Sequence, residues 1–183
     1  ISKLQGEFGV MQLQDKNFSV IALRQGTVSG YSPRMRLDLV INTMFKFAMN
    51  DKQITVNNPK IWRPILGIQD AIQAYKNSLK ADFDLSGIFN VCSGNYTIGD
   101  IGDIVSKKVE QLSNRKIEVI TKNVTDFRNY RVSIKSAQKL LNFSPKSSIE
   151  SIVDELYNNR EKFDDYENPN YYNIEIFKSH KNI

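Results

Sequence analysis

The stretch Phe18–Leu23, FSVIAL, followed by Gln25–Pro33, QGTVSGYSP, decides how this 183-residue sequence is expected to fold. A short apolar run without alternation is typical of a strand that is buried on both faces. The residues after it are rich in Gly and Ser, so they are expected to form a loop. Ligands of open α/β sheets bind beyond the carboxyl ends of strands, which makes this loop a candidate binding element.

Segments with helical and extended spacing alternate on both sides of that strand. Residues 1–15 form an amphipathic pattern in which Leu4, Phe8 and Met11 share one face. From Phe163 onward the chain is polar and aromatic with little periodicity, which predicts a surface tail or partial disorder. The pattern predicts further helices at 37–49, 70–79, 97–112, 133–141 and 148–157, and further strands at 54–56, 62–68, 87–91 and 116–120.

This alternation of strands and helices indicates an α/β fold. The units are too few for a complete doubly wound sheet, and no Gly-x-Gly-x-x-Gly fingerprint follows a first strand in these residues. Thr97, with Asp100 three residues later, is expected to cap the helix that follows it.

Composition argues against several classes of function. The net charge is +5, but no Lys/Arg run is present, so we expect no nucleic-acid binding. No apolar run reaches the ~20 residues that span a bilayer. The one cysteine, Cys92, favours a reducing compartment, and we expect the cytoplasm. No His/Cys/Asp/Glu spacing predicts a metal site, and a lone histidine argues against a serine hydrolase.

Three segments, taken in order and spacing, resemble the extended short-chain dehydrogenase/reductase family, in its NAD-dependent epimerase/dehydratase branch that acts on nucleotide-sugars. They are ISKLQGE (1–7), ALRQGTVSGYSPRMRLDLVIN (22–42) and WRPILGIQDAIQAY (62–75). The resemblance covers essentially the whole chain, as the C-terminal half of such an enzyme.

The resemblance implies the C-terminal part of a Rossmann-like doubly wound sheet plus a small α/β substrate-binding domain. Residues 1–33 would end the NAD(P)-binding domain. Residues 34–160 would form mainly the substrate-binding domain, with a returning Rossmann strand near 54–79. Residues 161–183 would be a C-terminal tail.

The family carries a Tyr-x-x-x-Lys motif, and Lys3 resembles its catalytic lysine. The tyrosine would lie two residues before Ile1, outside this sequence. A lysine one helical turn after a tyrosine shares its face, and its charge lowers the tyrosine pKa from its usual value of about 10. The resemblance further implies that Lys3 binds the nicotinamide ribose of NAD or NADP, and that Gln25, Gly26 and Thr27 lie beside the nicotinamide and the sugar.

A nucleotide-sugar diphosphate needs cationic and planar donors, which arginine supplies best. The resemblance places Arg63 and Arg128 at the diphosphate, with Arg131 as an alternative to Arg128. Together with Thr27, Arg36 and Asn42 they form the expected substrate-binding set. For any one of these arginines, a surface ion pair is the ordinary alternative.

The expected function is therefore that of the C-terminal portion of an NAD(P)-dependent nucleotide-sugar epimerase or dehydratase, acting by transient hydride transfer in a homodimer paired through the helix at 1–15. These residues alone are expected to be inactive. The alternative is a non-catalytic or degenerate fragment that binds a nucleotide-sugar. Gln25 and Thr27 replace the aromatic and Asn residues of several epimerases, and epimerase, dehydratase and reductase remain open.

Overall fold

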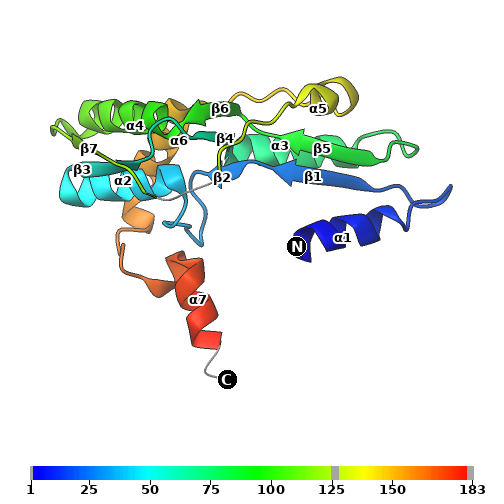
Figure 1. The fold of residues 1–183 in the computed structure, drawn as a ribbon, viewed down its shortest axis with the longest axis horizontal. Coiled ribbons are helices and arrows are strands. Elements are labelled where there is room, and N and C mark those ends of the chain that lie inside the picture. Colours follow the sequence, from blue (N-terminus) through cyan, green and yellow to red (C-terminus); the bar gives the residue numbers. More distant parts are fainter. Residues whose placement is uncertain (1, 125–127, 181–183) are drawn as a thin grey trace.

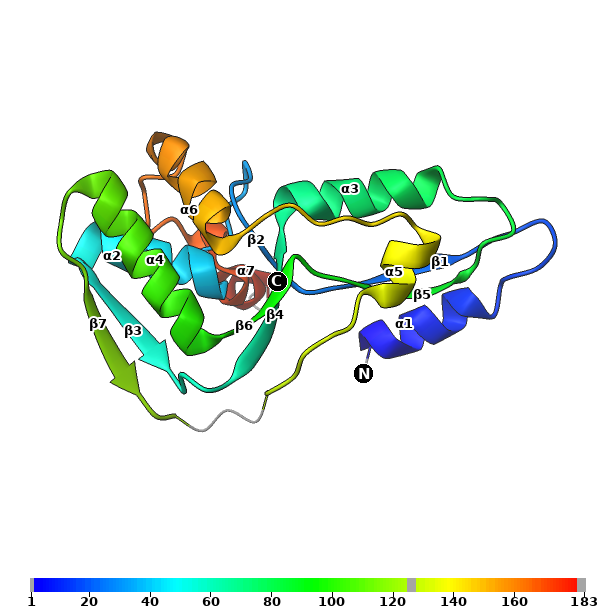
Figure 2. The same ribbon diagram turned by 90° about the horizontal axis from the view of Figure 1, so that it is seen from above.

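The computed structural model describes residues 2–124 and 128–180 and shows two lobes that meet at a short central sheet (Figure 1). In Figure 2 the lobe with β1, β5 and α3 lies on the right, and the lobe with α2, α4 and β3 on the left. The central strands β2, β4 and β6 lie between them.

The first lobe is built on strand β1 (Ile21–Gln25), which pairs in parallel with β5 (Gly87–Val91). Helix α3 (Ile68–Leu79) and the short helix α5 (Lys135–Leu140) pack against these strands, with Phe89 and Phe143 buried between them. Within 54–79, where a returning strand was expected, residues 65–67 pair in parallel with residues 27–29 and not with β1. Apolar runs identify strands but do not say which strands pair.

Helix α1 (Ser2–Met11) lies beside β1 and is shorter than the helix expected over 1–15. The cause is a tight turn, in which the carboxylate of Asp15 accepts a hydrogen bond from the backbone N–H of Asn17. Asp15 and Phe18 also form an isolated antiparallel bridge. The chain therefore reverses before it enters β1.

The central sheet joins β2 (Thr27–Ser29), β4 (Trp62–Gly67) and β6 (Gly94–Thr97). Strand β4 is parallel to β2 and antiparallel to β6. Gly26 separates β1 from β2, and its N–H donates to the carbonyl of Val91. A Cβ at position 26 would lie 2.9 Å from the carbonyl oxygen of Pro64, so glycine lets β4 approach where the chain changes sheets.

In the second lobe α2 and α4 pack against a two-stranded parallel sheet, and α6 packs against these two helices. The predicted cap of α4 is confirmed, because Thr97 and Asp100 form a reciprocal capping box. Gly102 of α4 lies against Val56, and a Cβ there would come within 2.4 Å of the valine side chain. The elements of this lobe are α2 (Val40–Asp51), β3 (Gln53–Asn57), α4 (Ile98–Ser113), β7 (Glu118–Lys122) and α6 (Ile149–Asn158).

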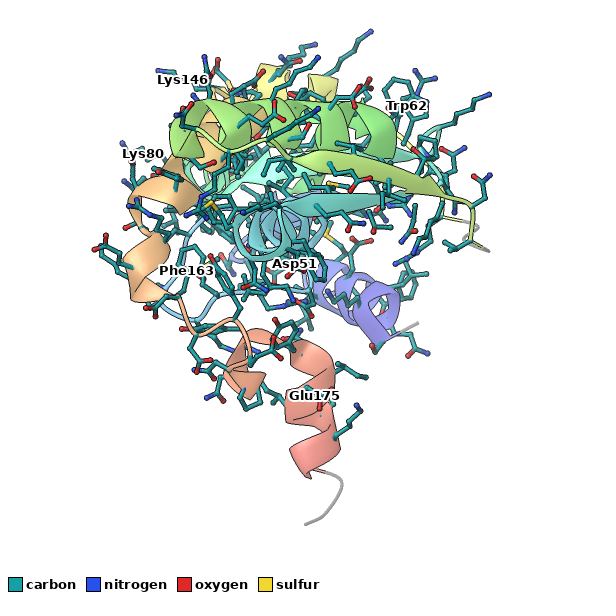
Figure 3. All side chains as sticks on the ribbon, turned by 90° about the vertical axis from the view of Figure 1, so that its left-hand side faces the viewer. Asp51, Trp62, Lys80, Lys146, Phe163 and Glu175 are labelled. Carbon is teal, nitrogen blue, oxygen red and sulfur yellow. The ribbon has the colours of Figure 1, made fainter. Side chains whose placement is uncertain are left out.

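The C-terminal segment is more ordered than the sequence predicted. It contains two short 3-10 helices, η1 (Arg160–Lys162) and η2 (Pro169–Tyr171), and the helix α7 (Asn173–His180). Phe163 is 1% exposed and stacks on Tyr31 in the core of the second lobe. Figure 3 shows Phe163 against the body and Glu175, on α7, beyond it. Single aromatic anchors hold an irregular segment without periodicity, which is why the pattern missed them.

A buried carboxylate joins the two lobes. Asp70, at the start of α3, accepts hydrogen bonds from Ser93 Oγ (2.6 Å) and from the backbone N–H groups of Lys146 (2.8 Å) and Ser147 (2.9 Å). Burial opposes ionisation of Asp70, but these hydrogen bonds outweigh it and hold its pKa below the ordinary value. The side chain thus ties α3 to the turn after β5 and to the connection between α5 and α6.

We predict that Asp70→Asn destabilises the protein by about 1–3 kcal/mol at neutral pH, because an amide N–H would face backbone donors. A depressed folded-state pKa stabilises the fold above the unfolded value of about 3.9, and this contribution is lost as the pH falls through the folded-state pKa. The difference in the free energy of unfolding between wild type and variant should therefore become smaller at acid pH. Urea unfolding at several pH values measures it, with Asp103→Asn, an exposed carboxylate on α4, as control. A difference in unfolding free energy that stays constant with pH would contradict the stabilising role of the Asp70 charge.

Candidate functional site

The main candidate site is a cleft of about 840 Å³ between α1 and the strands β1 and β2. It runs along the whole of β1 and continues past the carboxyl end of that strand, where the α/β rule places ligands. Residues from three separate segments line it: the helix α1, the β1–β2 connection and the loop before α2. Five of the residues selected from the sequence meet there, namely Lys3, Gln25, Gly26, Thr27 and Arg36.

Lys3 belongs to helix α1, which has few packing contacts with the rest of the protein. None of the residues of α1, all of which the structure describes, is buried. Instead Glu7, one turn after Lys3, accepts two hydrogen bonds from Arg24 of β1, from Nε at 2.8 Å and Nη2 at 2.6 Å. The Arg24 hydrogen bond lowers the pKa of Glu7. This bidentate ion pair fixes α1 and Lys3 beside β1.

Three residues at the junction of β1 and β2 line the cleft. The Gln25 amide is exposed but oriented, because its Nε2 donates to the Tyr75 hydroxyl of α3 at 2.6 Å. Gly26 is close to Pro64 and Cys92, so its lack of a side chain is required by packing. Thr27 begins β2 and is half-buried.

The loop before α2 brings Arg36 to the cleft, and Asn42 of α2 holds this loop through hydrogen bonds. Asn42 is 2% exposed, and its amide bonds to the backbone of Gly30 and to the carbonyl of Arg36. The side chain that was expected to contact substrate therefore supports the loop that carries Arg36. Arg36 itself forms a bidentate pair with Asp38.

Arg63 and Arg128 line a different pocket, of about 210 Å³, beside α2 and β3. Arg63 Nη1 donates to the carbonyl of Trp62 at 2.9 Å and to the carbonyl of Arg128. Arg131, the alternative to Arg128, stacks instead on the ring of Trp62 at 4.8 Å, near the surface of the molecule (Figure 3). The expected substrate residues thus divide between two sites, with the second site in the second lobe.

Within the described residues no group of three or more His, Cys, Asp or Glu side chains could hold a metal ion. Over the same residues no helix has the length and apolar character that crossing a membrane requires.

The sequence-based reasoning missed three charged residues that organise the cleft: Glu7, Arg24 and Asp38. Arg24 interrupts the end of an apolar strand, which is a signal for a paired charge. Asp38 lies two residues after Arg36, a spacing that puts two side chains on the same side of an extended chain, but the sequence has no strand pattern at this position.

Neither protein-family models nor curated protein sequences give a match to this chain. Solved structures do. UDP-glucuronic acid 4-epimerase from Bacillus cereus, in complex with UDP-glucuronic acid and NAD, superposes with a TM-score of 0.70 over 87% of this chain and 51% of that chain, at 24% identity. The dTDP-glucose 4,6-dehydratase of Bacillus anthracis, in complex with NAD, gives 0.69 over 89% and 53%, at 16% identity. RMD from Pseudomonas aeruginosa, complexed with NADPH, gives 0.71 over 87% and 55%, at 18% identity.

The chain spans about half the length of these structures. It therefore has the fold of about half of each of these structures. The α/β class expected from the sequence is confirmed, and so is the expected match to the C-terminal part of this Rossmann-like fold.

Proposed function

We propose that this chain is the C-terminal portion of an NAD(P)-dependent nucleotide-sugar epimerase or dehydratase that acts by transient hydride transfer at the sugar ring. The observation that carries the proposal is the meeting of Lys3, the Gln25–Thr27 connection and Arg36 on one cleft. The ligands named for the similar structures support the same class of ligand here. One structure contains UDP-glucuronic acid and NAD, another contains NAD, and the third contains NADPH.

The cleft suits an anionic ligand that carries ribose. Its volume lies within the ~300–1,000 Å³ that small-molecule and cofactor sites usually have. It offers the ammonium of Lys3 and the guanidinium of Arg36. When bound, a nicotinamide cofactor supplies the hydride acceptor.

Lys3 has two proposed roles in this chemistry. Its ammonium donates hydrogen bonds to the hydroxyl groups of the ribose, whose oxygens accept hydrogen bonds. Its charge also stabilises the phenolate of a tyrosine one turn earlier, so that this tyrosine removes a proton from the sugar hydroxyl. Thr27 and Arg36 would orient the sugar and its anionic neighbours, and Arg63 and Arg128 the diphosphate.

The second candidate is a fragment or degenerate relative that binds a nucleotide-sugar without catalysis. The pocket of Arg63 and Arg128 favours it, because that pocket lies within one lobe and does not involve Lys3. Binding without turnover would therefore be compatible with this half of the fold.

We predict that the isolated 183 residues give no turnover, since the proposed base lies outside them. The assay follows the absorbance of reduced nicotinamide after addition of NAD and UDP-glucuronic acid, with product analysis by chromatography. Measurable epimerisation or hydride transfer by these residues would refute the assignment of the base.

Arg63→Ala should weaken binding of UDP-glucuronic acid by ~1.5–3 kcal/mol, the range for hydrogen bonds to charged groups. Arg63→Lys should recover part of this loss, because lysine keeps the charge but lacks the planar fork. NAD binding should change little. Calorimetric titration with both ligands measures this, and Arg115→Ala, an exposed arginine after α4, is the control. Equal losses for both ligands, or none, would remove Arg63 from the site.

We further propose that the protein forms a homodimer through α1. Leu4 and Phe8 are 64% and 66% exposed on one face of this helix, an apolar surface suited to helix pairing. Light scattering should give the mass of a dimer, and Phe8→Glu should shift it to the monomer. Phe177→Glu on α7, which changes an equally exposed ring, should leave the mass unchanged. A monomeric wild type at high concentration would contradict this assembly.

A further inference from the structure

The loop before α2 presents its side chains alternately to the core and to the cleft side. Met35 and Leu37 are fully buried in the core of the second lobe. Arg36 and Asp38, which alternate with them, keep about a third and a quarter of their side chains exposed. The two charged residues are therefore held at a boundary between core and solvent.

The C-terminal segment binds this loop through three hydrogen bonds. The backbone N–H of Leu37 donates to the carbonyl of Tyr171 at 3.0 Å. Arg34 Nη2 donates to the side-chain oxygen of Asn173 at 2.7 Å. The backbone N–H of Asn173 donates to Asp38 Oδ2 at 3.2 Å. Residues that lie 135 positions apart in the sequence thus form one unit.

Asp38 lies between this segment and Arg36. Its Oδ1 accepts from Arg36 Nε at 2.7 Å, and its Oδ2 accepts from Arg36 Nη2 at 3.1 Å. A guanidinium carries five N–H donors in a rigid plane, so this pair uses two of them. The other three point away from Asp38, and Arg36 lines the cleft that also contains Lys3.

The C-terminal segment is itself firmly attached. Phe163 is buried against Phe45 of α2, and the Tyr172 hydroxyl accepts from Lys46 Nζ at 3.2 Å. Lys46 also lies 5.3 Å from the centre of the Tyr172 ring. A segment anchored by core packing is a rigid reference for a flexible arginine.

We propose that Asp38 is the residue that positions Arg36 in the cleft, and that the backbone N–H of Asn173 orients Asp38 for this purpose. The consequence for ligand binding rests on the proposed function, since it requires Arg36 to meet an anionic ligand. An arginine already held in its binding orientation loses less side-chain freedom when the ligand arrives. The C-terminal segment would in this way adjust the affinity of a cleft that it does not line.

Two substitutions at position 173 separate the backbone contact from the side-chain contact. Asn173→Pro removes the N–H that reaches Asp38, and Asn173→Ala keeps it; both remove the partner of Arg34. Proline is well tolerated at the first residue of a helix, and Asn173 begins α7. The preceding Tyr172 has φ −127° and ψ 115°, the extended conformation that a residue before proline prefers. Asp38→Asn tests the carboxylate, with Asp154→Asn, which pairs with Lys108, as a matched control.

The first measurement needs no ligand. ¹⁵N relaxation of the Arg36 Nε–H group reports the order of the guanidinium, and we expect it to be rigid in wild type, Asn173→Ala and Asp154→Asn. It should become mobile in Asp38→Asn and in Asn173→Pro. A guanidinium that stays rigid in both of these variants, or is mobile in wild type, would overturn the positioning role.

The second measurement is the affinity for UDP-glucuronic acid. Asp38→Asn and Asn173→Pro should each weaken binding roughly fivefold to tenfold, which is within the range of one ordinary hydrogen bond, because both act on the ligand only through Arg36. In an Arg36→Ala background the same substitutions should have no further effect, because Asp38 acts through Arg36. Equal losses in both backgrounds would refute this coupling. If wild type does not bind the nucleotide-sugar, the proposed function fails, while the relaxation data still decide the role of Asp38.

Discussion

The arrangement of the two lobes depends on one buried carboxylate. Asp70 is 3% exposed, and it is nevertheless held in its charged form by three donors from two distant segments. A charge buried in this way is tolerated only if its hydrogen bonds are complete, so the donors and the segments that carry them must be in place together. Close packing strengthens the constraint, because a Cβ on Gly67 would overlap the Ser147 side chain. These contacts therefore fix how closely the connection from α5 to α6 approaches the start of α3.

The cleft beside β1 is organised by ion pairs more than by a core. Glu7 with Arg24 fixes α1, and Asp38 orients the Arg36 side chain on the loop before α2. Exposed pairs of this kind stabilise a fold little, because water competes for both partners. Their effect here is on orientation: bidentate geometry restricts a long side chain to one direction. The ion pairs thus order the side chains of the cleft, where α1 makes few apolar contacts.

The two proposed binding regions are lined by different residues, and this separation suits a ligand with two ends. Lys3 and the β1–β2 connection belong to the lobe that contains the parallel pair β1–β5, whereas Arg63 and Arg128 lie beside α2 and β3. The central strand β4 joins both regions, since it begins at Trp62 and pairs with β2 at Thr27. A displacement of β4 would therefore change the distance between the two regions that are proposed to bind the two ends of such a ligand.

The sequence by itself determined the α/β class, most helices and a strand that overlaps FSVIAL, because burial in strands and helices leaves a repeated pattern of apolar residues. The observed strand is Ile21–Gln25, so it begins and ends later than the apolar run. The sequence also selected Lys3, Gln25, Gly26, Thr27 and Arg36, which the fold brings to one cleft. Tertiary structure alone decided that β1 pairs with residues 87–91, that the three-residue strand β2 lies inside an expected loop, and that Phe163 anchors the C-terminal segment. It also decided that Asn42 supports the loop and that Asp38, Glu7 and Asp70 orient other groups. These features come from single contacts between residues far apart in the chain, and such contacts have no period for a sequence pattern to reveal.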